Sequence, residues 1–249
     1  MTFKQKLTLL FAFCLLLLGA TSTTSHASEQ TLLNSAAVKK IKKSGVLKVG
    51  VKQDVPNFGY YSAKTKSYEG MEIDIARKIA KSLNVKPVFT AVTAQTREAV
   101  MDNGQVDMVI ATYTITPERQ KSYAFSNAYY TDEIGFLVQR KNKISTVKDL
   151  NHKTIGVAQG STTKAAIEEY AKAHNLSFNF VQLGSYPELA ISLYANRIQA
   201  FSVDKSILTG YRSSKSKILI EGFNTQSYGI ASKKSNQQFI SYVNTLISK

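Results

Sequence analysis

The chain has 249 residues and a hydrophobic fraction of 43%, which suits one large globular domain or two small ones. Its formal net charge of +15 at pH 7 favours polyanionic partners, but the lysines are spread along the chain; we therefore expect no nucleic-acid function and consider anionic cell-surface polymers instead. The single cysteine, Cys14, lies near the N-terminus, which excludes disulfides, a thiol nucleophile and cysteine metal ligands from the rest of the chain.

The N-terminus has the features of a secretory signal peptide in the usual order. Two lysines precede an apolar run from Leu7 to Leu18, and a short polar stretch ends in Ala27. The apolar run is shorter than the about 20 residues that span a bilayer. We expect cleavage after Ala27 and a secreted, extracytoplasmic protein, with an uncleaved anchor helix as the alternative. No cysteine follows the small-residue stretch, so no lipid anchor is expected.

Helical and strand patterns alternate in the next part of the chain. Apolar residues recur every four positions from Met71 to Leu83, which predicts an amphipathic helix. The elements expected here are helices over 36–43, 71–83 and 97–103 and strands over 46–51, 86–91 and 106–110. This alternation predicts an α/β layer architecture.

A further strand precedes the polar, basic stretch 140–143, and a similar series of elements follows it from Thr154. The strands expected are 134–139, 155–157, 178–181, 200–203 and 228–231, and the helices are 162–173, 186–194, 204–211 and 237–248. Because the second half resembles the first in layout, we expect two similar α/β lobes joined near Arg140.

Six short motifs occur in one order along the chain. They are Val49-Gly50-Val51, Gly70-Met71-Glu72-Ile73-Asp74, Asn103-Gly104-Gln105-Val106-Asp107, Thr114–Arg119, Gln159–Thr163 and Ala200–Asp204. Together they resemble the polar amino-acid-binding proteins of bacterial ABC importers, family 3 of the extracellular solute-binding proteins. The resemblance covers nearly all of the chain from about Val38, and it is nearest to the branch that binds acidic amino acids.

The resemblance implies a type II periplasmic-binding-protein fold, in which two α/β lobes are joined by a two-strand hinge and close over a ligand. The segments it implies are a signal peptide over 1–27, an N-terminal segment with the first helix over 28–43, lobe 1 over 44–139 plus 226–249, and lobe 2 over 140–225. It also implies a free amino acid as ligand, the membrane subunits of an ABC permease as partner, and a monomer without cofactor or metal.

Three residues of the first lobe are implied to hold the ligand's α-carboxylate. A guanidinium group meets a carboxylate with two parallel hydrogen bonds, and Arg119 matches the family's arginine for this purpose. Thr112 and Thr114 would add backbone or hydroxyl contacts. For Arg119 the alternative is a surface ion pair.

The second lobe is implied to bind both charged ends of the ligand. Thr162 and Thr163 stand at the start of an expected helix, where unpaired N–H groups and the helix dipole favour an anion. Asp204, at the end of an expected strand, matches the residue that accepts hydrogens from the ligand's ammonium group. For Ser161 or Thr162, and for Asp204, capping of the helix is the alternative.

Ligand selectivity is expected to depend on Lys52 and Arg97. In the acidic-amino-acid branch a lysine and an arginine at such positions meet the ligand's second carboxylate. Lys52, Arg97 and Arg119 against Asp204 leave a net charge of +2, which suits a ligand of net charge −1. We therefore expect glutamate or aspartate, with glutamine or another polar amino acid as the alternative. Three aromatic residues are candidate walls of the cleft, or else core residues: Phe58, Tyr186 and Tyr228.

The sequence also bears on three other functions. An enzyme is not expected, because the three histidines and the carboxylates form no recognisable nucleophile–base pair or metal-ligand spacing. An adhesin that uses the basic outer surface is compatible with transport through the cleft. A receptor's sensing domain is disfavoured, because no transmembrane segment is predicted after the signal.

Overall fold

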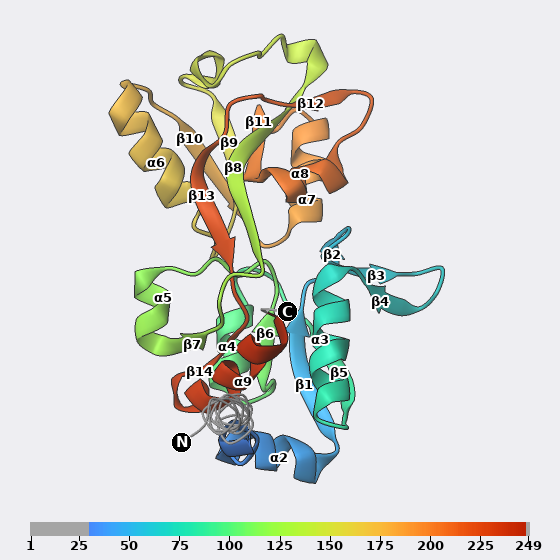
Figure 1. Cartoon of the computed structure of the whole chain (residues 1–249). Coiled ribbons are helices and arrows are strands. Elements are labelled where there is room, and N and C mark those ends of the chain that lie inside the picture. The colour runs from blue at the N-terminus through green and yellow to red at the C-terminus, as the bar shows by residue number, and fades with distance from the viewer. Residues whose placement is uncertain (1–29, 248–249) are drawn as a thin grey trace, which may run out of the picture.

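The computed structural model describes residues 30–247, and the predicted signal peptide lies outside them. The described chain forms two α/β lobes, with β8 (Tyr130–Gln139) and β13 (Phe223–Tyr228) running side by side between them (Figure 1). These two strands pair antiparallel, Tyr130 opposite Tyr228, so the chain crosses to the second lobe and returns through one two-strand connection.

The first lobe is built on a five-stranded sheet with the order β5-β1-β6-β14-β7. Its strands are β1 (Val46–Val51), β5 (Lys86–Ala91), β6 (Met108–Ile110), β7 (Tyr123–Phe125) and β14 (Ala231–Lys233). β1 pairs in parallel with β5 and β6, whereas β14 is antiparallel to β6 and β7. The lobe's helices are α2 (Ala36–Ser44), α3 (Met71–Ser82), α4 (Arg97–Asp102), α5 (Pro117–Ser122) and α9 (Gln237–Ile247), and a 3₁₀ turn, η3 (Lys234–Asn236), precedes α9.

A small three-stranded sheet, which the sequence analysis did not anticipate, extends from the first lobe. It consists of β2 (Asp54–Val55), β3 (Gly59–Ser62) and β4 (Ser67–Glu69), paired antiparallel. These strands are short and mix polar with aromatic residues, so they give little periodic signal.

The second lobe is built on a sheet with the order β10-β9-β11-β8-β12, to which β13 is added beside β8. Its other strands are β9 (Thr154–Ala158), β10 (Asn179–Leu183), β11 (Ala200–Asp204) and β12 (Ser216–Ile218). The helices are α6 (Thr163–His174), α7 (Tyr186–Tyr194) and α8 (Lys205–Tyr211), with 3₁₀ turns η1 (Arg140–Asn142) and η2 (Val147–Leu150). β8 belongs to this sheet by its pairing with β11 and β12. The lobe limits given in the sequence analysis stay predictions.

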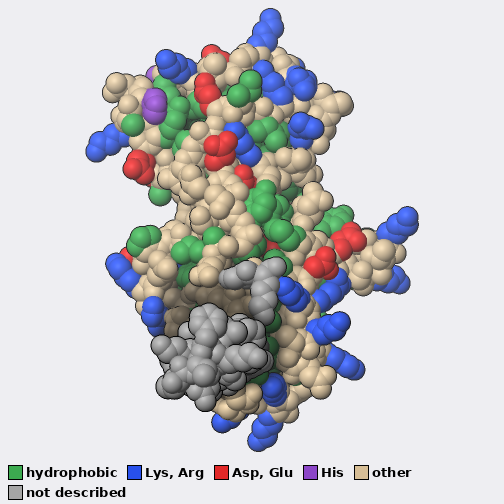
Figure 2. All heavy atoms as spheres, viewed as in Figure 1, with side chains coloured by type: hydrophobic (Ala, Val, Ile, Leu, Met, Phe, Trp, Pro, Cys, Tyr) green, Lys and Arg blue, Asp and Glu red, His purple; other side chains and the backbone are tan. Residues whose placement is uncertain are grey.

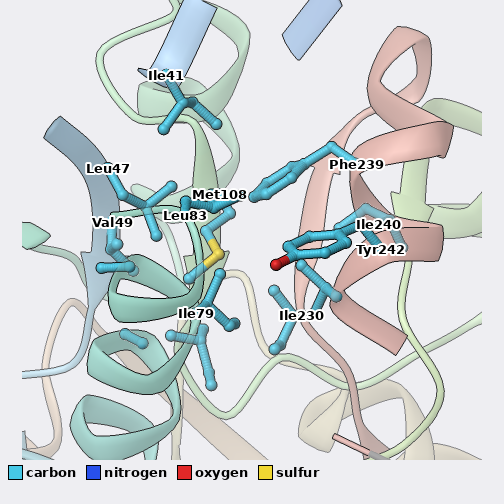
Figure 3. Close-up of a cluster of buried hydrophobic side chains, with 14 of the residues drawn as sticks. Ile41, Leu47, Val49, Ile79, Leu83, Met108, Ile230, Phe239, Ile240 and Tyr242 are labelled. Carbon is cyan, nitrogen blue, oxygen red and sulfur yellow. The ribbon is translucent and has the colours of Figure 1, made fainter. Parts of the chain in front are cut away.

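The core of the first lobe joins the two ends of the described chain. Leu47 and Val49 of β1, Ile79 of α3, and Phe239 and Ile240 of α9 are fully buried in one cluster (Figure 3). Burying such side chains contributes about 1.5–3 kcal/mol each. The C-terminal helix α9 therefore completes the core of the first lobe, which supports the strands and the loops at their ends.

The expected strand over 228–231 is wrong. β13 ends at Tyr228 in the second sheet and β14 begins at Ala231 in the first, so Gly229 and Ile230 carry the chain between two sheets. A continuous apolar run in the sequence does not show that its two halves pair with different partners.

No helix within residues 30–247 is long and apolar enough to cross a bilayer. On the face shown in Figure 2, Lys and Arg side chains are scattered over both lobes rather than gathered in one patch.

Candidate functional site

The predicted site residues gather where the two lobes meet. In the first lobe most of them follow the carboxyl ends of β1, β5 and β6, and in the second lobe most lie at or after the ends of β9, β10 and β11. In α/β sheets these strand ends are the usual place for ligand contacts, because loops and helix N-termini converge there. Atoms of the two lobes are in direct contact at this point, which is therefore a closed interlobe site.

Both predicted arginines donate across the interface to one acceptor, the backbone carbonyl of Gly160 in the β9–α6 loop. The Arg119 Nη2 atom lies 3.1 Å from that oxygen and the Arg97 Nη2 atom 3.4 Å. Within the first lobe, Arg119 Nη1 donates to the Thr114 carbonyl at 2.9 Å, and Arg97 Nη1 donates to the Thr112 carbonyl at 3.2 Å. Backbone carbonyls thus fix both guanidinium groups toward the second lobe.

A tyrosine that sequence reasoning missed supports both arginines. The guanidinium carbons of Arg97 and Arg119 lie 4.1 Å and 4.5 Å from the ring centroid of Tyr113. The Tyr113 hydroxyl donates to Glu98 at 2.7 Å, and that carboxylate also lies 3.5 Å from Arg119 Nε. Burial, aided by the neighbouring Arg97, lowers the pKa of Arg119 to about 10, so it remains a cation at neutral pH.

Lys52 is buried at the end of β1 and points toward the second lobe. Its Nζ atom lies 3.1 Å from Asp54 Oδ1 and 4.4 Å from the ring centroid of Tyr186, the first residue of α7. Burial lowers the pKa of Lys52, and the adjacent Asp54 opposes that shift. The lysine therefore links a carboxylate of its own lobe with an aromatic ring of the other lobe.

Asp204 is the buried acid of the second lobe. It ends β11 and accepts a hydrogen bond from the Tyr228 hydroxyl. Burial raises the pKa of Asp204 to about 7, whereas the Tyr228 hydrogen bond and the charges of Arg97 and Arg119 lower it. Its side chain makes no capping hydrogen bond to α8, so the capping alternative is wrong.

The predicted anion site at α6 is arranged differently from a simple helix cap. Thr163 begins the helix and is buried, as expected for a residue facing the interface. The Thr162 hydroxyl donates to the Gln226 side-chain oxygen at 2.8 Å instead of capping α6. Ser161 donates to the Ala158 carbonyl at 2.7 Å. The capping alternative therefore fails here too, and Thr162 is tied to the return strand β13.

Two of the predicted aromatic walls lie at the two-strand crossover formed by β8 and β13, and Tyr228 is the last residue of β13. The Phe58 ring lies 5.0 Å from Tyr130 and 6.0 Å from Tyr228, measured between centroids and near edge-on in both cases. Phe58 and Tyr228 are both buried, so they join the site to the hydrophobic core of the second lobe.

The predicted net charge of +2 is wrong, because three carboxyl groups near the cations were left out. Asp54 pairs with Lys52, and Glu98 lies beside Arg119. Glu72 is fully buried and within the electrostatic reach of Lys52 and Arg97. Asp54 lies two positions from Lys52 and Glu98 lies next to Arg97, so the sequence itself indicated that these acids could offset the predicted cations. The charge count consequently no longer selects an anionic ligand.

No group of His, Cys, Asp and Glu residues that could hold a metal ion occurs in the part of the chain that the structure describes.

Comparison with known proteins identifies relatives over nearly the whole chain. The model of the bacterial extracellular solute-binding proteins, family 3, matches residues 47–249. A glutamine-binding protein of Geobacillus stearothermophilus is 36% identical over 227 residues, covering 89% of this chain and 83% of that protein. The ABC transporter glutamine-binding protein GlnH of Bacillus subtilis (strain 168) is 31% identical, covering 99% and 91%. A glutamate/aspartate import solute-binding protein of Escherichia coli (strain K12) is more distant at 22% identity, covering 92% and 79%.

The arginine-bound form of ArgBP from T. maritima has a similar structure, with a TM-score of 0.78 at 24% identity, covering 84% of this chain and 98% of that one. At this level of identity the likeness concerns the fold alone, and it confirms the predicted type II periplasmic-binding-protein fold with two α/β lobes.

Proposed function

The chain belongs to the bacterial extracellular solute-binding proteins, family 3, and we propose that it is the substrate-binding subunit of an amino-acid ABC importer. The family comprises binding proteins, so the chain is not an enzyme. The observation that carries the proposal is the closed interlobe site, where two guanidinium groups from one lobe meet a buried carboxyl group and a helix N-terminus of the other.

This arrangement suits a zwitterion. Arg119 would bind the ligand's α-carboxylate together with the N-terminal amide groups of α6 near Thr163, because both favour an anion. Asp204, oriented by the Tyr228 hydroxyl, would accept hydrogens from the ligand's ammonium group. Each charged end of the ligand thereby gains a partner inside the site, as burial of a charge requires.

Glutamine is the side-chain specificity that the relatives favour. Two relatives above 30% identity are named as glutamine-binding proteins. Once the neighbouring carboxyl groups are counted, the site no longer has the excess positive charge that would favour an anionic ligand over a neutral one.

Glutamate or aspartate is the second candidate, and Arg97 favours it. Within residues 30–247 its guanidinium donates only to backbone carbonyls, and its Nε atom is buried without a hydrogen-bond partner. A buried donor without an acceptor costs about 1–3 kcal/mol, and a ligand carboxylate would relieve that cost.

Calorimetric titration tests both the role and the ligand. Protein beginning at Ser28 would be freed of carried-over ligand by unfolding and refolding, then titrated with glutamine, glutamate, aspartate and arginine. Binding of a polar amino acid in the wild type, weakened by about a hundredfold or more in Arg119→Ala, supports the proposal. Lys121→Ala is the matched control, because Lys121 is an exposed cation on the same helix.

The identity of the best ligand then separates the two candidates. If an acidic amino acid binds tightest, Arg97→Gln should weaken it more than it weakens glutamine, since the lost interaction is with the second carboxylate. If glutamine binds tightest, glutamine is the substrate. A folded protein that binds none of the four would contradict the proposed function.

Retention by anionic cell-surface polymers is a further part of this proposal. Basic side chains are scattered over both lobes on the face in Figure 2. Exposed charges act through screened interactions, so raising the salt concentration should release the protein from cells.

A further inference from the structure

Glu72 is a buried acid whose contacts reach the site from outside it. It is the second residue of α3 and has no exposed surface. Its Oε1 atom accepts a hydrogen bond from the Thr112 backbone N–H at 2.6 Å and another from the Tyr129 hydroxyl at 2.5 Å. One carboxyl group therefore joins α3 to the loop after β6 and to the start of the first crossover strand.

The backbone before α3 explains why this acid points inward. Gly70 has a φ of +117°, and a Cβ atom there would lie 2.3 Å from the Phe58 carbonyl oxygen. The Glu72 N–H donates to that same oxygen at 3.0 Å. Only glycine fits this close approach. Gly70 therefore permits the backbone conformation that directs the Glu72 carboxyl group into the interior.

Thr112 has an unfavourable backbone conformation, and its hydrogen bond to Glu72 helps to stabilise that conformation. Its φ of +44° lies in the left-handed region, which a β-branched residue rarely adopts. Glu72 holds its N–H, and Arg97 Nη1 holds its carbonyl at 3.2 Å. The Thr112 hydroxyl is buried without a hydrogen-bond partner in the described chain. Arg97 Nη1 also donates to the Ala111 carbonyl at 3.0 Å, and that carbonyl forms one peptide group with the Thr112 N–H. This peptide therefore connects Glu72 directly to the guanidinium of Arg97.

Tyr129 extends the connection to the second lobe. It immediately precedes β8, and its backbone N–H donates to the Tyr228 carbonyl at 2.9 Å. The Tyr228 hydroxyl in turn donates to Asp204. A continuous series of contacts therefore runs from Glu72 through the two crossover strands to the acid proposed to bind the ligand's ammonium group.

We propose that Glu72 is a positioning residue of the ligand site, which holds the Thr112 peptide so that Arg97 faces the second lobe and ties that peptide to the crossover through Tyr129. The inference rests on the proposed function, because it assigns a ligand-binding role to Arg97. Burial raises the pKa of Glu72, and its hydrogen bonds with Tyr129 and Thr112 oppose that shift. One acceptor oxygen satisfies both donors, so a neutral carboxamide can replace the acid.

The test compares Glu72→Gln, which keeps the acceptor oxygen, with Glu72→Leu, which removes it. Asp74→Asn is the control, because Asp74 is an exposed acid on the same helix. With whichever amino acid the wild type binds, Glu72→Leu should weaken binding by about tenfold or more. Glu72→Gln should stay within about threefold, and Asp74→Asn should match the wild type. Thermal unfolding monitors that each variant is folded.

An NMR measurement distinguishes positioning from general stabilisation. The Thr112 amide proton should resonate downfield in the wild type because of its short hydrogen bond to Glu72. The resonance should move upfield in Glu72→Leu and be largely retained in Glu72→Gln. If Glu72→Leu does not fold, Tyr129→Phe takes its place for the affinity measurement and should weaken binding by a few-fold.

Several results would overturn the inference. They are an unchanged affinity in folded Glu72→Leu, an equal loss in Glu72→Gln and Glu72→Leu, and an unmoved Thr112 resonance. A wild type that binds no amino acid would contradict the proposed function instead. In that case the Thr112 resonance alone decides whether Glu72 holds this peptide.

Discussion

At the scale of single residues, the site places opposite charges on opposite lobes. Arg97 and Arg119 extend from the first lobe, and Asp204 ends a strand of the second. Arg97 and Asp204 are buried and Arg119 is partly buried, so each depends more on a few fixed partners than on water. The protonation of Asp204 is the most sensitive of these arrangements, because its pKa lies near physiological pH.

Ligand affinity should therefore depend on pH through Asp204. Burial raises the pKa of this carboxyl group to about 7, so below that pH it must lose a proton before it can accept hydrogens from an ammonium group. We expect the dissociation constant to rise by up to about tenfold per pH unit below about pH 7 and to level off above it. Titrations between about pH 5 and about pH 8 measure this, and a flat profile would contradict the assignment.

The stability of the ligand-free protein should respond to the same group in the opposite direction. Asp204 binds its proton more tightly in the folded chain than in the unfolded chain, where its pKa is about 3.9. Its contribution to the free energy of unfolding is therefore complete below about pH 4 and is lost as the pH rises through about 7.

The sequence predicted most of the groups that meet at the interface, but not how they are held. Lys52 and Arg97 were recognisable because they follow or begin elements whose ends face the cleft. Glu72 was visible within a motif, yet its partners lie 40 and 57 positions away in the chain. Contacts between such distant residues depend on how the lobes pack, and local sequence patterns carry no information about that.

At the scale of elements, the β9–α6 loop of the second lobe lies directly against the first lobe. Gly160 has a φ of +73°, and a Cβ atom there would lie 2.6 Å from the Ala94 carbonyl oxygen and 2.8 Å from Gln95 Cα. These atoms belong to the loop between β5 and α4 in the other lobe. The missing side chain thus permits the approach that brings the Gly160 carbonyl to both arginines.

Gly160→Ala should accordingly hold the lobes apart. The added methyl group meets backbone atoms that cannot move aside, and the left-handed φ is strained for alanine. We expect ligand affinity to fall by about tenfold or more while the protein remains folded. Gly184→Ala is the matched control, because a Cβ atom at Gly184 would meet only a side-chain oxygen of Glu188 at 3.6 Å. Equal affinity in the two variants would show that this contact does not govern closure.

Sequence patterns located the long elements well and the connecting elements poorly. The helices over 71–82 and 186–194 have clear periodicity and were predicted almost to their ends. The strand expected over 228–231 contains only the last residue of β13 and the first of β14, because the two residues between them are as compatible with a strand as their neighbours are. Strand exchange between lobes is set by the partner sheets, which a single segment does not reveal.

At the scale of the whole molecule, the two lobes are held together outside the charged site as well. The Tyr211 hydroxyl of α8 donates to the Asp54 carbonyl of the first lobe. Next to it, Gly210 lets Pro56 approach, because a Cβ atom there would lie 2.9 Å from the Pro56 ring. These contacts involve no charged group of the proposed ligand site, so they favour the closed arrangement with or without a ligand.

Tyr211→Phe should shift the balance between open and closed forms toward the open one. The variant keeps the ring and loses one interlobe hydrogen bond worth about 0.5–1.5 kcal/mol. Apparent affinity should fall by a few-fold, because it scales with the fraction of protein in the binding-competent form. The radius of gyration of the ligand-free protein, measured by small-angle X-ray scattering, should increase. Tyr61→Phe, at a half-exposed position in β3, is the control. Unchanged affinity and radius would remove Tyr211 from the closure mechanism.

The most direct test of the account is a crystal structure of the protein with the amino acid that binds it tightest. The account predicts the α-carboxylate between Arg119 and the N-terminus of α6, the ammonium group against Asp204, and the side chain toward Lys52 and Arg97. A ligand bound elsewhere on the molecule, or one that lies between the lobes without contacting Arg119 and Asp204, would contradict it.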